Sequence, residues 1–383
     1  MSAVDAEVAV VGVGTMGSMA LWQLARRGVR AIGFEQFRVG HELGAGVGEA
    51  RQFRSNWLED AVRDVMPLAE GEYRALEAES GLSLLTITGG LTIGPEDAPG
   101  MSELLDRIAE AGEAPVLLSR DEMARKHPQH VLEGDDIVIW NEHTGFIRPE
   151  LAIAAAVDSA RGRGARIVED CRITRIDPDS DGVTLHAGDQ VWRVRRVIVT
   201  VGPWIWRLLP AGPGGGDLGR LLLTWFPTRD ATAFAVGRYS TFTRHTREET
   251  IYGLPSLWSG TVRVGFAGPR SRFDDPDELD RLHVPREDLE RIEALVARLM
   301  PGLVPTVIRT GTHLDSYTRD GQPLVGALDP AGRAIAGAAF AGRGFKMAPV
   351  IGRILADLAA DGGTDLDITA WRPDRFAAGP APL

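Results

Sequence analysis

Apolar and polar positions follow a regular pattern over the first 35 residues of the chain. The run Glu7–Val11 is short, apolar and rich in β-branched residues, which predicts a buried parallel strand. From Ser18 to Arg27 the apolar residues follow helical spacing, and Gly28 ends this predicted helix. A second apolar run, Arg30–Phe34, predicts the next strand. The chain therefore begins with a strand–helix–strand unit, which is typical of a parallel α/β sheet.

Three glycines stand between the first strand and the helix. Gly12 allows a tight turn, Gly14 lets the backbone approach a pyrophosphate, and Gly17 lets helix and strand pack closely. The free N–H groups at the helix N-terminus favour a phosphate there. Glu35 lies 23 residues after Gly12, where an acid accepts hydrogen bonds from an adenosine ribose. This order favours nucleotide binding over a turn without a ligand, and it leaves NAD and FAD as alternatives.

The rest of the chain alternates between predicted helices and strands, with no repeats and no low-complexity tail. Helical patterns occupy about 58–80, 102–112, 149–163, 286–299 and 349–361. A Gly/Pro-rich connection at 210–217 precedes strand-like runs that form a second sheet. The predicted strands after the first two are 137–140, 165–169, 173–176, 183–186, 197–201, 221–226, 234–236, 250–253, 262–266, 308–313 and 334–339.

Composition narrows the class of protein. At 383 residues the chain has room for two domains or one large interleaved unit. Its net charge is −11 without a basic run, so we expect no nucleic-acid partner. No apolar run approaches the roughly 18 residues that span a bilayer, and the N-terminus lacks the pattern of a signal peptide. Cys171 is the only cysteine, which fits a reducing cytoplasm.

Further segments of the chain match the motifs of one known family. Besides the first glycine segment with Glu35, they are residues 48–54 (GEARQFR), 145–149 (GFIRP), 199–204 (VTVGPW), 252–255 (YGLP), 320–326 (DGQPLVG), 342–349 (GRGFKMAP) and 365–368 (DLDI). Over its whole length the chain resembles the monomeric sarcosine oxidase and N-methyltryptophan oxidase family, within the wider D-amino-acid-oxidase and glycine-oxidase superfamily. The glycine block at 342–349 is the discriminating feature. Simple NAD-dependent dehydrogenases do not need such a block, whereas this family closes the flavin site with it.

The resemblance implies an α/β fold with a discontinuous Rossmann-type FAD-binding domain. That domain would take residues 1–85, 145–220 and 315–383. A catalytic domain with a mainly antiparallel sheet and helices would take residues 86–144 and 221–314. The cofactor-binding positions that the resemblance implies are Gly12, Gly14, Thr15, Met16, Gly17, Glu35, Gln36, Arg51, Ile173, Gly202, His313, Gly342, Gly344, Phe345 and Lys346.

Hydride transfer to flavin N5 leaves negative charge on the N1–C2 edge of the ring, and a fixed cation stabilises that charge. The resemblance implies that Lys346 lies at this edge and near the substrate carboxylate, with Arg51 beside the flavin. Arg54 matches the family's carboxylate-binding arginine, and an arginine fork suits a carboxylate. Only Lys126 and Lys346 are lysines among 42 basic residues, so arginine serves almost everywhere else. The alternative for each cation is a solvated surface residue.

Two aromatic residues are weaker candidates for the substrate site. Tyr252 matches a tyrosine in the family's active-site wall, and a tyrosine of the core is the alternative. Trp57, just past Arg54, is a candidate for the pocket wall.

The sequence departs from the family at three places. His313 stands where relatives bind FAD through a cysteine thioether, so we expect non-covalent FAD, with a histidyl bond as the alternative. Arg263 stands where the family places a lysine over the flavin for reaction with dioxygen. Either Arg263 still stabilises superoxide, or it binds an anionic part of the substrate and the reaction with oxygen is slow. The segment 44–48 lacks the family's two histidines, so substrate identity is not carried over.

These features predict an FAD-dependent oxidase of a small secondary amine or N-methyl amino acid. It would give an imine and hydrogen peroxide, with dioxygen as acceptor and no metal, membrane or nucleic-acid partner, in a cytoplasmic monomer. An FAD-dependent dehydrogenase or desaturase with weak oxygen reactivity is the alternative. A non-catalytic flavin-binding protein and an NAD-dependent dehydrogenase are further alternatives. The cluster of cations disfavours the former, and a yellow protein would exclude the latter.

Overall fold

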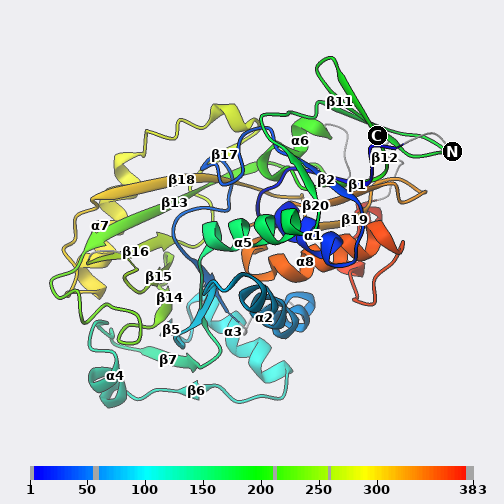
Figure 1. Ribbon diagram of the computed structural model, residues 1–383. Helices are drawn as coiled ribbons and strands as arrows, with labels where there is room; N and C mark the ends of the chain where they lie inside the picture. The colour runs from blue at the N-terminus through cyan, green and yellow to red at the C-terminus, as the bar shows by residue number, and fades with distance from the viewer. Residues whose placement is uncertain (1–3, 55–59, 210–213, 258–259, 377–383) are drawn as a thin grey trace.

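The computed structural model describes residues 4–54, 60–209, 214–257 and 260–376. Two large sheets lie side by side in it, the eight-stranded one at the right and the nine-stranded one at the left of Figure 1. A small three-stranded sheet of β3 (Arg51–Phe53), β8 (Gly145–Ile147) and β4 (Leu85–Ile87) completes the set.

The eight-stranded sheet has the parallel centre that the first 35 residues predict. Its main order is β10-β11-β12-β1-β2-β9, and β20 pairs with β12 while β19 pairs with β20. The strands β1, β2, β9, β12 and β20 are parallel where they pair. The bounds are β1 Ala6–Val11, β2 Ala31–Phe34, β9 Arg166–Val168, β10 Arg175–Pro178, β11 Val183–Ala187, β12 Gln190–Val199, β19 Leu324–Ala327 and β20 Ala334–Ala338.

Four helices belong to the hydrophobic core of this sheet: α1 (Thr15–Arg26), α2 (Asp60–Ser80), α5 (Pro149–Gly162) and α8 (Gly344–Ala360). Val8 and Val10 of β1 join this core, as their apolar pattern requires. Helices α1 and α8 come very close, because a Cβ at Gly352 would lie 2.6 Å from the Cβ of Met19. The first and the last long helix of the chain thus pack against each other.

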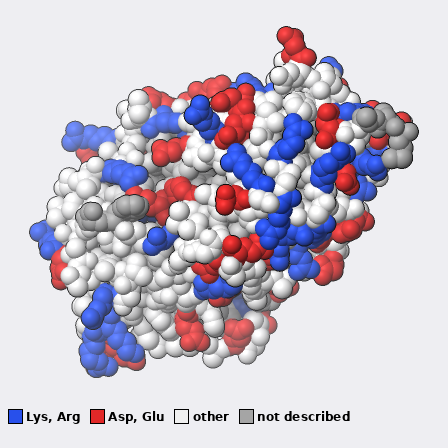
Figure 2. Space-filling model, in the orientation of Figure 1, with Lys and Arg blue, Asp and Glu red and all other residues white. Residues whose placement is uncertain are grey.

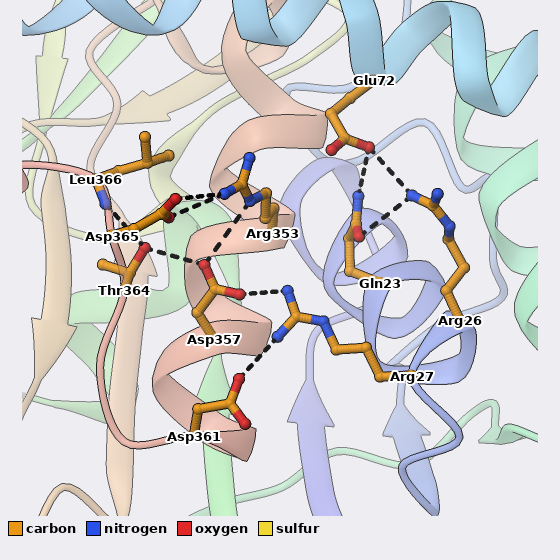
Figure 3. A network of polar contacts seen from close by, with 10 residues as sticks. All are labelled: Gln23, Arg26, Arg27, Glu72, Arg353, Asp357, Asp361, Thr364, Asp365 and Leu366. Atoms are coloured by element: carbon orange, nitrogen blue, oxygen red, sulfur yellow. Dashed lines mark hydrogen bonds and ion pairs between the residues drawn. The ribbon is translucent and has the colours of Figure 1, made fainter.

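Polar contacts fasten the ends of these helices together (Figure 3). Asp357 of α8 pairs with Arg27, which follows α1, and its other oxygen accepts a hydrogen bond from the hydroxyl of Thr364 at 2.9 Å. Glu72 of α2 accepts hydrogen bonds from Gln23 at 2.8 Å and from Arg26 at 3.2 Å. Ion pairs at such partly exposed positions contribute little each, but they add orientation to the apolar packing.

The nine-stranded sheet has two chemically different faces. Its main order is β17-β13-β16-β15-β14-β5-β7-β6, with β18 paired to β13, and β14 is parallel to β5. Leu222, Phe226, Val262 and Val264 form a core with one side of helix α7 (Arg286–Leu299). The bounds are β5 Gly90–Pro95, β6 Val116–Leu117, β7 Asp136–Asn141, β13 Leu218–Pro227, β14 Thr241–His245, β15 Thr250–Leu254, β16 Thr261–Phe266, β17 Arg272–Phe273 and β18 Arg309–Ser316.

The other face of the same sheet carries polar and aromatic side chains. Trp225 pairs with Arg263 on one side and Arg309 on the other, and Leu221 pairs with His313. Because directly paired residues share a face and side chains alternate along a strand, these residues lie on one face, opposite the α7 core. The strands of this sheet come from two separate stretches of the chain, residues 90–141 and 218–316.

Most of the predicted helices are present with small shifts at their ends. The shorter helices α3 (Pro99–Glu110) and α4 (Arg120–Lys126) lie in the segment before β7, and α4 was not predicted. The predicted strand at 234–236 is wrong, because the chain forms turns and only isolated bridges there.

Acidic and basic side chains interleave over much of the face in Figure 2.

Helix α8 begins five residues earlier than predicted, at Gly344 instead of Pro349. Proline lacks the N–H that would bond the carbonyl four residues back, so it usually marks a helix start. Here the hydroxyl of Tyr73 donates a 2.6 Å hydrogen bond to that carbonyl, the one of Phe345. This bond from α2 allows the helix to include Pro349 and places Lys346 in its first turn.

Substitution of Gly352 tests the close contact between α1 and α8. We expect Gly352→Ala to lower the free energy of unfolding by about 1–3 kcal/mol, because its methyl group would overlap Met19. The matched control is Gly71→Ala in α2, where a Cβ meets nothing within 4 Å. That control should gain about 0.5–1 kcal/mol of helix stability. Denaturant unfolding of both variants measures the difference, and equal effects would contradict the close packing.

Lowering the pH should destabilise the apolar core between the nine-stranded sheet and α7, because His130 packs against that core. Its ring stacks on Tyr239 with the centroids 5.2 Å apart, and burial, then the charge of Arg244, lowers the pKa of His130 to about 3. Between pH 6.5 and 3 the unfolded chain binds a proton here that the folded chain does not, so stability falls as pH is lowered. The slope is at most about 1.4 kcal/mol per pH unit. His130→Phe should flatten that slope in urea unfolding, and an unchanged slope would refute this assignment.

Candidate functional site

One long cavity runs between the first glycine segment and the glycine block near the C-terminus. Its empty volume is about 1650 Å³, including the part that is open to solvent. Twelve of the predicted site residues line it: Gly12, Gly14, Thr15, Met16, Glu35, Gln36, Arg51, Ile173, Gly202, Gly342, Gly344 and Phe345. Gly17 and Lys346 lie behind this wall, and Arg263, His313 and Tyr252 lie on the polar face of the nine-stranded sheet.

The first glycine segment has the geometry that its residue types predict. A Cβ at Gly17 would lie 1.8 Å from the carbonyl oxygen of Gly12, so only glycine allows helix α1 to approach the turn. Gly12 itself has a φ of 88°, which glycine adopts without strain. A Cβ at Gly14, in contrast, meets no protein atom within 4 Å. Gly14 therefore leaves space in the cavity, whereas Gly17 serves the packing.

Glu35 forms the acidic end of the cavity, where its carboxylate accepts hydrogen bonds from the N–H groups of Val13 at 2.9 Å and Phe37 at 3.1 Å. Burial acts to raise its pKa, but hydrogen bonds from His41 and Val13 outweigh this and lower the pKa of Glu35. His41 Nδ1 accepts the N–H of Leu43 at 3.1 Å. Its Nε2, 3.5 Å from Glu35, is therefore the nitrogen that carries the proton in the neutral ring. No motif in the sequence pointed to His41.

The turn before α8 is held in an unusual conformation. Ala339 and Ala341 have positive φ angles of 55° and 51°, which cost free energy in residues with a side chain. Asp315 at the end of β18 accepts the N–H groups of Gly342 and, at 2.9 Å, Ser316. Asp315 lines the cavity, and burial raises its pKa. Sequence reasoning missed it, although its spacing of two from His313 placed it on the same face.

Lys346 follows directly after two residues that line the cavity. It is 7% exposed, so the alternative of a surface lysine is wrong. Gly344 and Phe345 form the cavity wall, and Lys346 lies one residue behind them in the first turn of α8. Nearly complete burial of an ammonium group requires compensating partners.

Arg51 brings a guanidinium group to the cavity wall. Its Nη2 donates to the carbonyl of Ala45 at 2.8 Å, and its Nη1 donates to the carbonyl of Ala50 at 3.0 Å. Burial lowers the pKa of Arg51, whereas Tyr252, Glu150 and Asp315 act in the opposite direction. Arginine stays charged at neutral pH even so.

Arg263 and His313 are the buried polar residues of the sheet face next to Arg51. Arg263 Nη1 donates to the carbonyls of Gly48, at 2.7 Å, and Ala50. Burial lowers the pKa of Arg263 to about 10, so it is charged at neutral pH. Burial and then the charges of Arg51, Arg281 and Arg263 lower the pKa of His313 to about 3, so its ring is neutral. Among the described residues, neither ring nitrogen of His313 has a hydrogen-bond partner.

The remaining candidates lie beside this group. Tyr252 is on β15 with its ring 5.8 Å from the guanidinium carbon of Arg263. Arg54 Nη1 donates to the hydroxyl of Thr243 at 3.1 Å, and burial lowers the pKa of Arg54 to about 10. Trp57 lies outside the described residues.

The residues present fit a dinucleotide that ends in a large ring system. One end of the cavity offers Glu35 and the helix α1 N-terminus, which suit an adenosine ribose and a pyrophosphate. Arg51, Asp315, Gly344 and Phe345 also line the cavity. The glycine block thus adds a second wall, which the shorter site of a simple NAD-dependent dehydrogenase does not need. The fold and the cavity together define a flavin-dependent oxidoreductase.

Comparison with known proteins agrees with this class. The model of the family "FAD dependent oxidoreductase" matches residues 7–358, and the chain belongs to that family. Its cofactor is FAD, and it is an oxidoreductase that acts on the CH–NH bonds of an amine or amino acid.

Individual relatives match nearly the whole chain. The monomeric sarcosine oxidase of Streptomyces avermitilis is 28% identical over 381 residues, which cover 98% of this chain and 99% of the relative. The N-methyl-L-tryptophan oxidase of Yersinia pestis is 23% identical, covering 97% of this chain and 100% of the relative. The open form of NikD, an unusual amino acid oxidase essential for nikkomycin biosynthesis, has the same fold. Its TM-score is 0.86 at 23% identity, covering 97% of this chain and 98% of that one.

Among the described residues, no helix is long and apolar enough to cross a membrane. In the same part of the chain, no three His, Cys, Asp or Glu side chains gather as metal ligands.

Two glycines of the first segment should respond differently to an added methyl group. Gly14→Ala should leave the apoprotein as stable as before but weaken FAD binding by about 1–3 kcal/mol, or roughly 5- to 150-fold in Kd, since its methyl group would occupy cofactor space. Gly17→Ala should destabilise the apoprotein itself. Flavin fluorescence titration and apoprotein melting separate the two effects. Wild-type FAD affinity in Gly14→Ala would contradict this account of the cavity.

Proposed function

We propose that this protein oxidises a small secondary amine or N-methyl amino acid to an imine, with release of hydrogen peroxide. Membership of the family and the amine oxidases among its relatives support this reaction. The observation that carries it is the arrangement at one end of the cavity. Arg51 lies on the wall there, and the buried Lys346 directly follows the wall residues Gly344 and Phe345.

Bound FAD supplies the hydride acceptor at N5 and the conjugated ring that takes up the negative charge. We infer that Arg51 and Lys346 give that charge a fixed positive surrounding, which is most effective where water is excluded. Arg54 is proposed to bind the substrate carboxylate, because its guanidinium is partly buried beside Thr243 of the nine-stranded sheet. Tyr252 is proposed to form part of the substrate wall.

Dioxygen is the proposed electron acceptor, although Arg263 stands where the family has a lysine over the flavin. Two backbone carbonyls hold Nη1 of Arg263, while its Nε and Nη2 have no hydrogen-bond partner among the described residues. Arg263 therefore keeps a fixed positive charge with unused donors, and this favours an oxidase over a dehydrogenase. We also propose that FAD is bound without a covalent link. Cys171 lines the adenosine end beside Glu35, and His313 is not among the residues that line the cavity.

An anaerobic screen tests the proposed reaction. The holoenzyme is mixed with N-methyl, cyclic, D- and L-amino acids while the flavin absorbance is followed, and we expect bleaching with at least one secondary amine. After oxygen is admitted, one peroxide should form per flavin reduced. Arg54→Met should raise KM for an amino acid about 100-fold or more, since a charge-assisted bidentate contact is lost. Arg286→Met, which removes an exposed arginine, is the control.

The outcomes of this screen separate the alternatives. Flavin that never bleaches with any amine would contradict the proposal. Bleaching followed by reoxidation only with an artificial acceptor would favour the dehydrogenase. Acid precipitation of the same holoenzyme should leave FAD in the supernatant, whereas a covalent bond would keep the yellow colour in the pellet.

A further inference from the structure

One row of residues crosses three strands of the nine-stranded sheet on its polar face. Trp225 of β13 is the middle member, paired with Arg263 of β16 and with Arg309 of β18. Arg263 and Trp225 are buried, whereas Arg309 is exposed, with its guanidinium carbon 4.4 Å from the centre of the Trp225 ring. The row therefore leads from the interior next to Arg51 to the surface.

All three members of the row bind the segment Gly48–Ala50, which comes from the FAD-binding part of the chain. Arg263 donates to the carbonyls of Gly48 and Ala50, on both sides of Glu49. The indole N–H of Trp225 donates to Glu49 Oε2 at 3.0 Å. Arg309 forms an ion pair with the other oxygen of the same carboxylate. Both oxygens of Glu49 are thus bound by side chains of the nine-stranded sheet.

The backbone of this segment is strained and is held from its other side as well. Glu49 has a φ of 68°, a conformation that residues with a side chain rarely adopt. Glu150 of α5 accepts the N–H groups of Gly48 at 2.7 Å and of Glu49 at 3.1 Å. Such a conformation persists only when the surroundings impose it, and it is found mainly at functional sites.

The strained segment determines where the guanidinium group of Arg51 lies. The carbonyl of Ala50 accepts hydrogen bonds from both Arg263 and Arg51. Arg51 is the next residue along the chain, and it reaches the cavity wall from there. A shift of Glu49 would therefore move the Ala50 carbonyl, and Arg51 would lose its hydrogen bond to that carbonyl.

We propose that Glu49 is a positioning residue, which acts through the Ala50 carbonyl to fix Arg51 at the flavin. The row Arg263–Trp225–Arg309 is the support on which Glu49 is anchored. The inference rests on the proposed role of Arg51. Through these contacts, the half-exposed ion pair of Glu49 with Arg309 helps to set the flavin's reduction potential.

The sign of a potential shift distinguishes positioning from a simple charge effect. Loss of a carboxylate near the flavin raises the midpoint potential through space, because the negative charge had disfavoured the reduced anion. Loss of positioning lowers the potential, because Arg51 no longer stabilises that anion. Glu49→Gln and Glu49→Gly remove the same charge, but only glutamine keeps an oxygen for Trp225 or Arg309. Glycine also adopts the positive φ without strain, which limits damage to the fold.

The test measures midpoint potential and anaerobic flavin reduction of both holoenzymes well below their melting temperatures. For Glu49→Gly we expect the reduction equilibrium constant to fall about tenfold, or about 30 mV for a two-electron couple. Its bleaching rate should also fall roughly tenfold. Glu49→Gln should keep the wild-type potential or raise it. Equal shifts in the two variants, in either direction, would overturn the proposal.

Two further variants separate this proposal from the one on which it rests. Trp225→Phe removes the indole donor to Glu49 without a change of charge and should lower the potential. Arg51→Met should lower the potential at least as much as Glu49→Gly. If Arg51→Met does so and Glu49→Gly does not, positioning by Glu49 is wrong and the role of Arg51 stands. If neither lowers it, the role of Arg51 itself is wrong.

Discussion

The nine-stranded sheet has to satisfy two environments at once, and the arrangement of the cofactor site depends on this constraint. Leu222 and Phe226 of β13 and Val262, Val264 and Phe266 of β16 pack toward α7, so the intervening positions must face the other way. Those positions carry Trp225, Arg263 and, on β18, His313. The charge of Arg263 is tolerable because the carbonyls of Gly48 and Ala50 accept its hydrogen bonds, and the indole N–H of Trp225 meets the carboxylate of Glu49. The sheet thus uses the alternation of its strands to present a polar face to the segment that follows β2.

The same principle, a polar group satisfied by a distant segment, shapes the C-terminal glycine block. Pro349 leaves the carbonyl of Phe345 without a helical partner, and the hydroxyl of Tyr73 fills that role. Asp315 holds the turn in front of the helix through the N–H of Gly342. Two contacts from different parts of the chain therefore fix the helix start, and with it the depth at which Lys346 is buried.

The sequence predicted those features that depend on neighbouring residues. The strand–helix–strand unit, the separate roles of Gly14 and Gly17, and the end position of Glu35 all follow from local pattern. The burial of Lys346 was expected from its motif and from the scarcity of lysine. The contacts of Glu49 could not be predicted, because Trp225 and Arg309 are 176 and 260 residues away along the chain, and their position beside Glu49 depends on strand register. The start of α8 was misjudged because the rule for proline is local, whereas Tyr73 comes from another helix.

The packing of α1 against α8 has a consequence for how the chain is made. On the ribosome, the first helix emerges long before the last one, which begins at residue 344. Until α8 is synthesised, the side of α1 around Met19 lacks its cover, and the cavity lacks its second wall. Such exposed apolar surface favours aggregation of nascent chains. FAD can therefore be enclosed only near the end of synthesis, and a chain that stops before α8 has a bare helix face and no complete cofactor site.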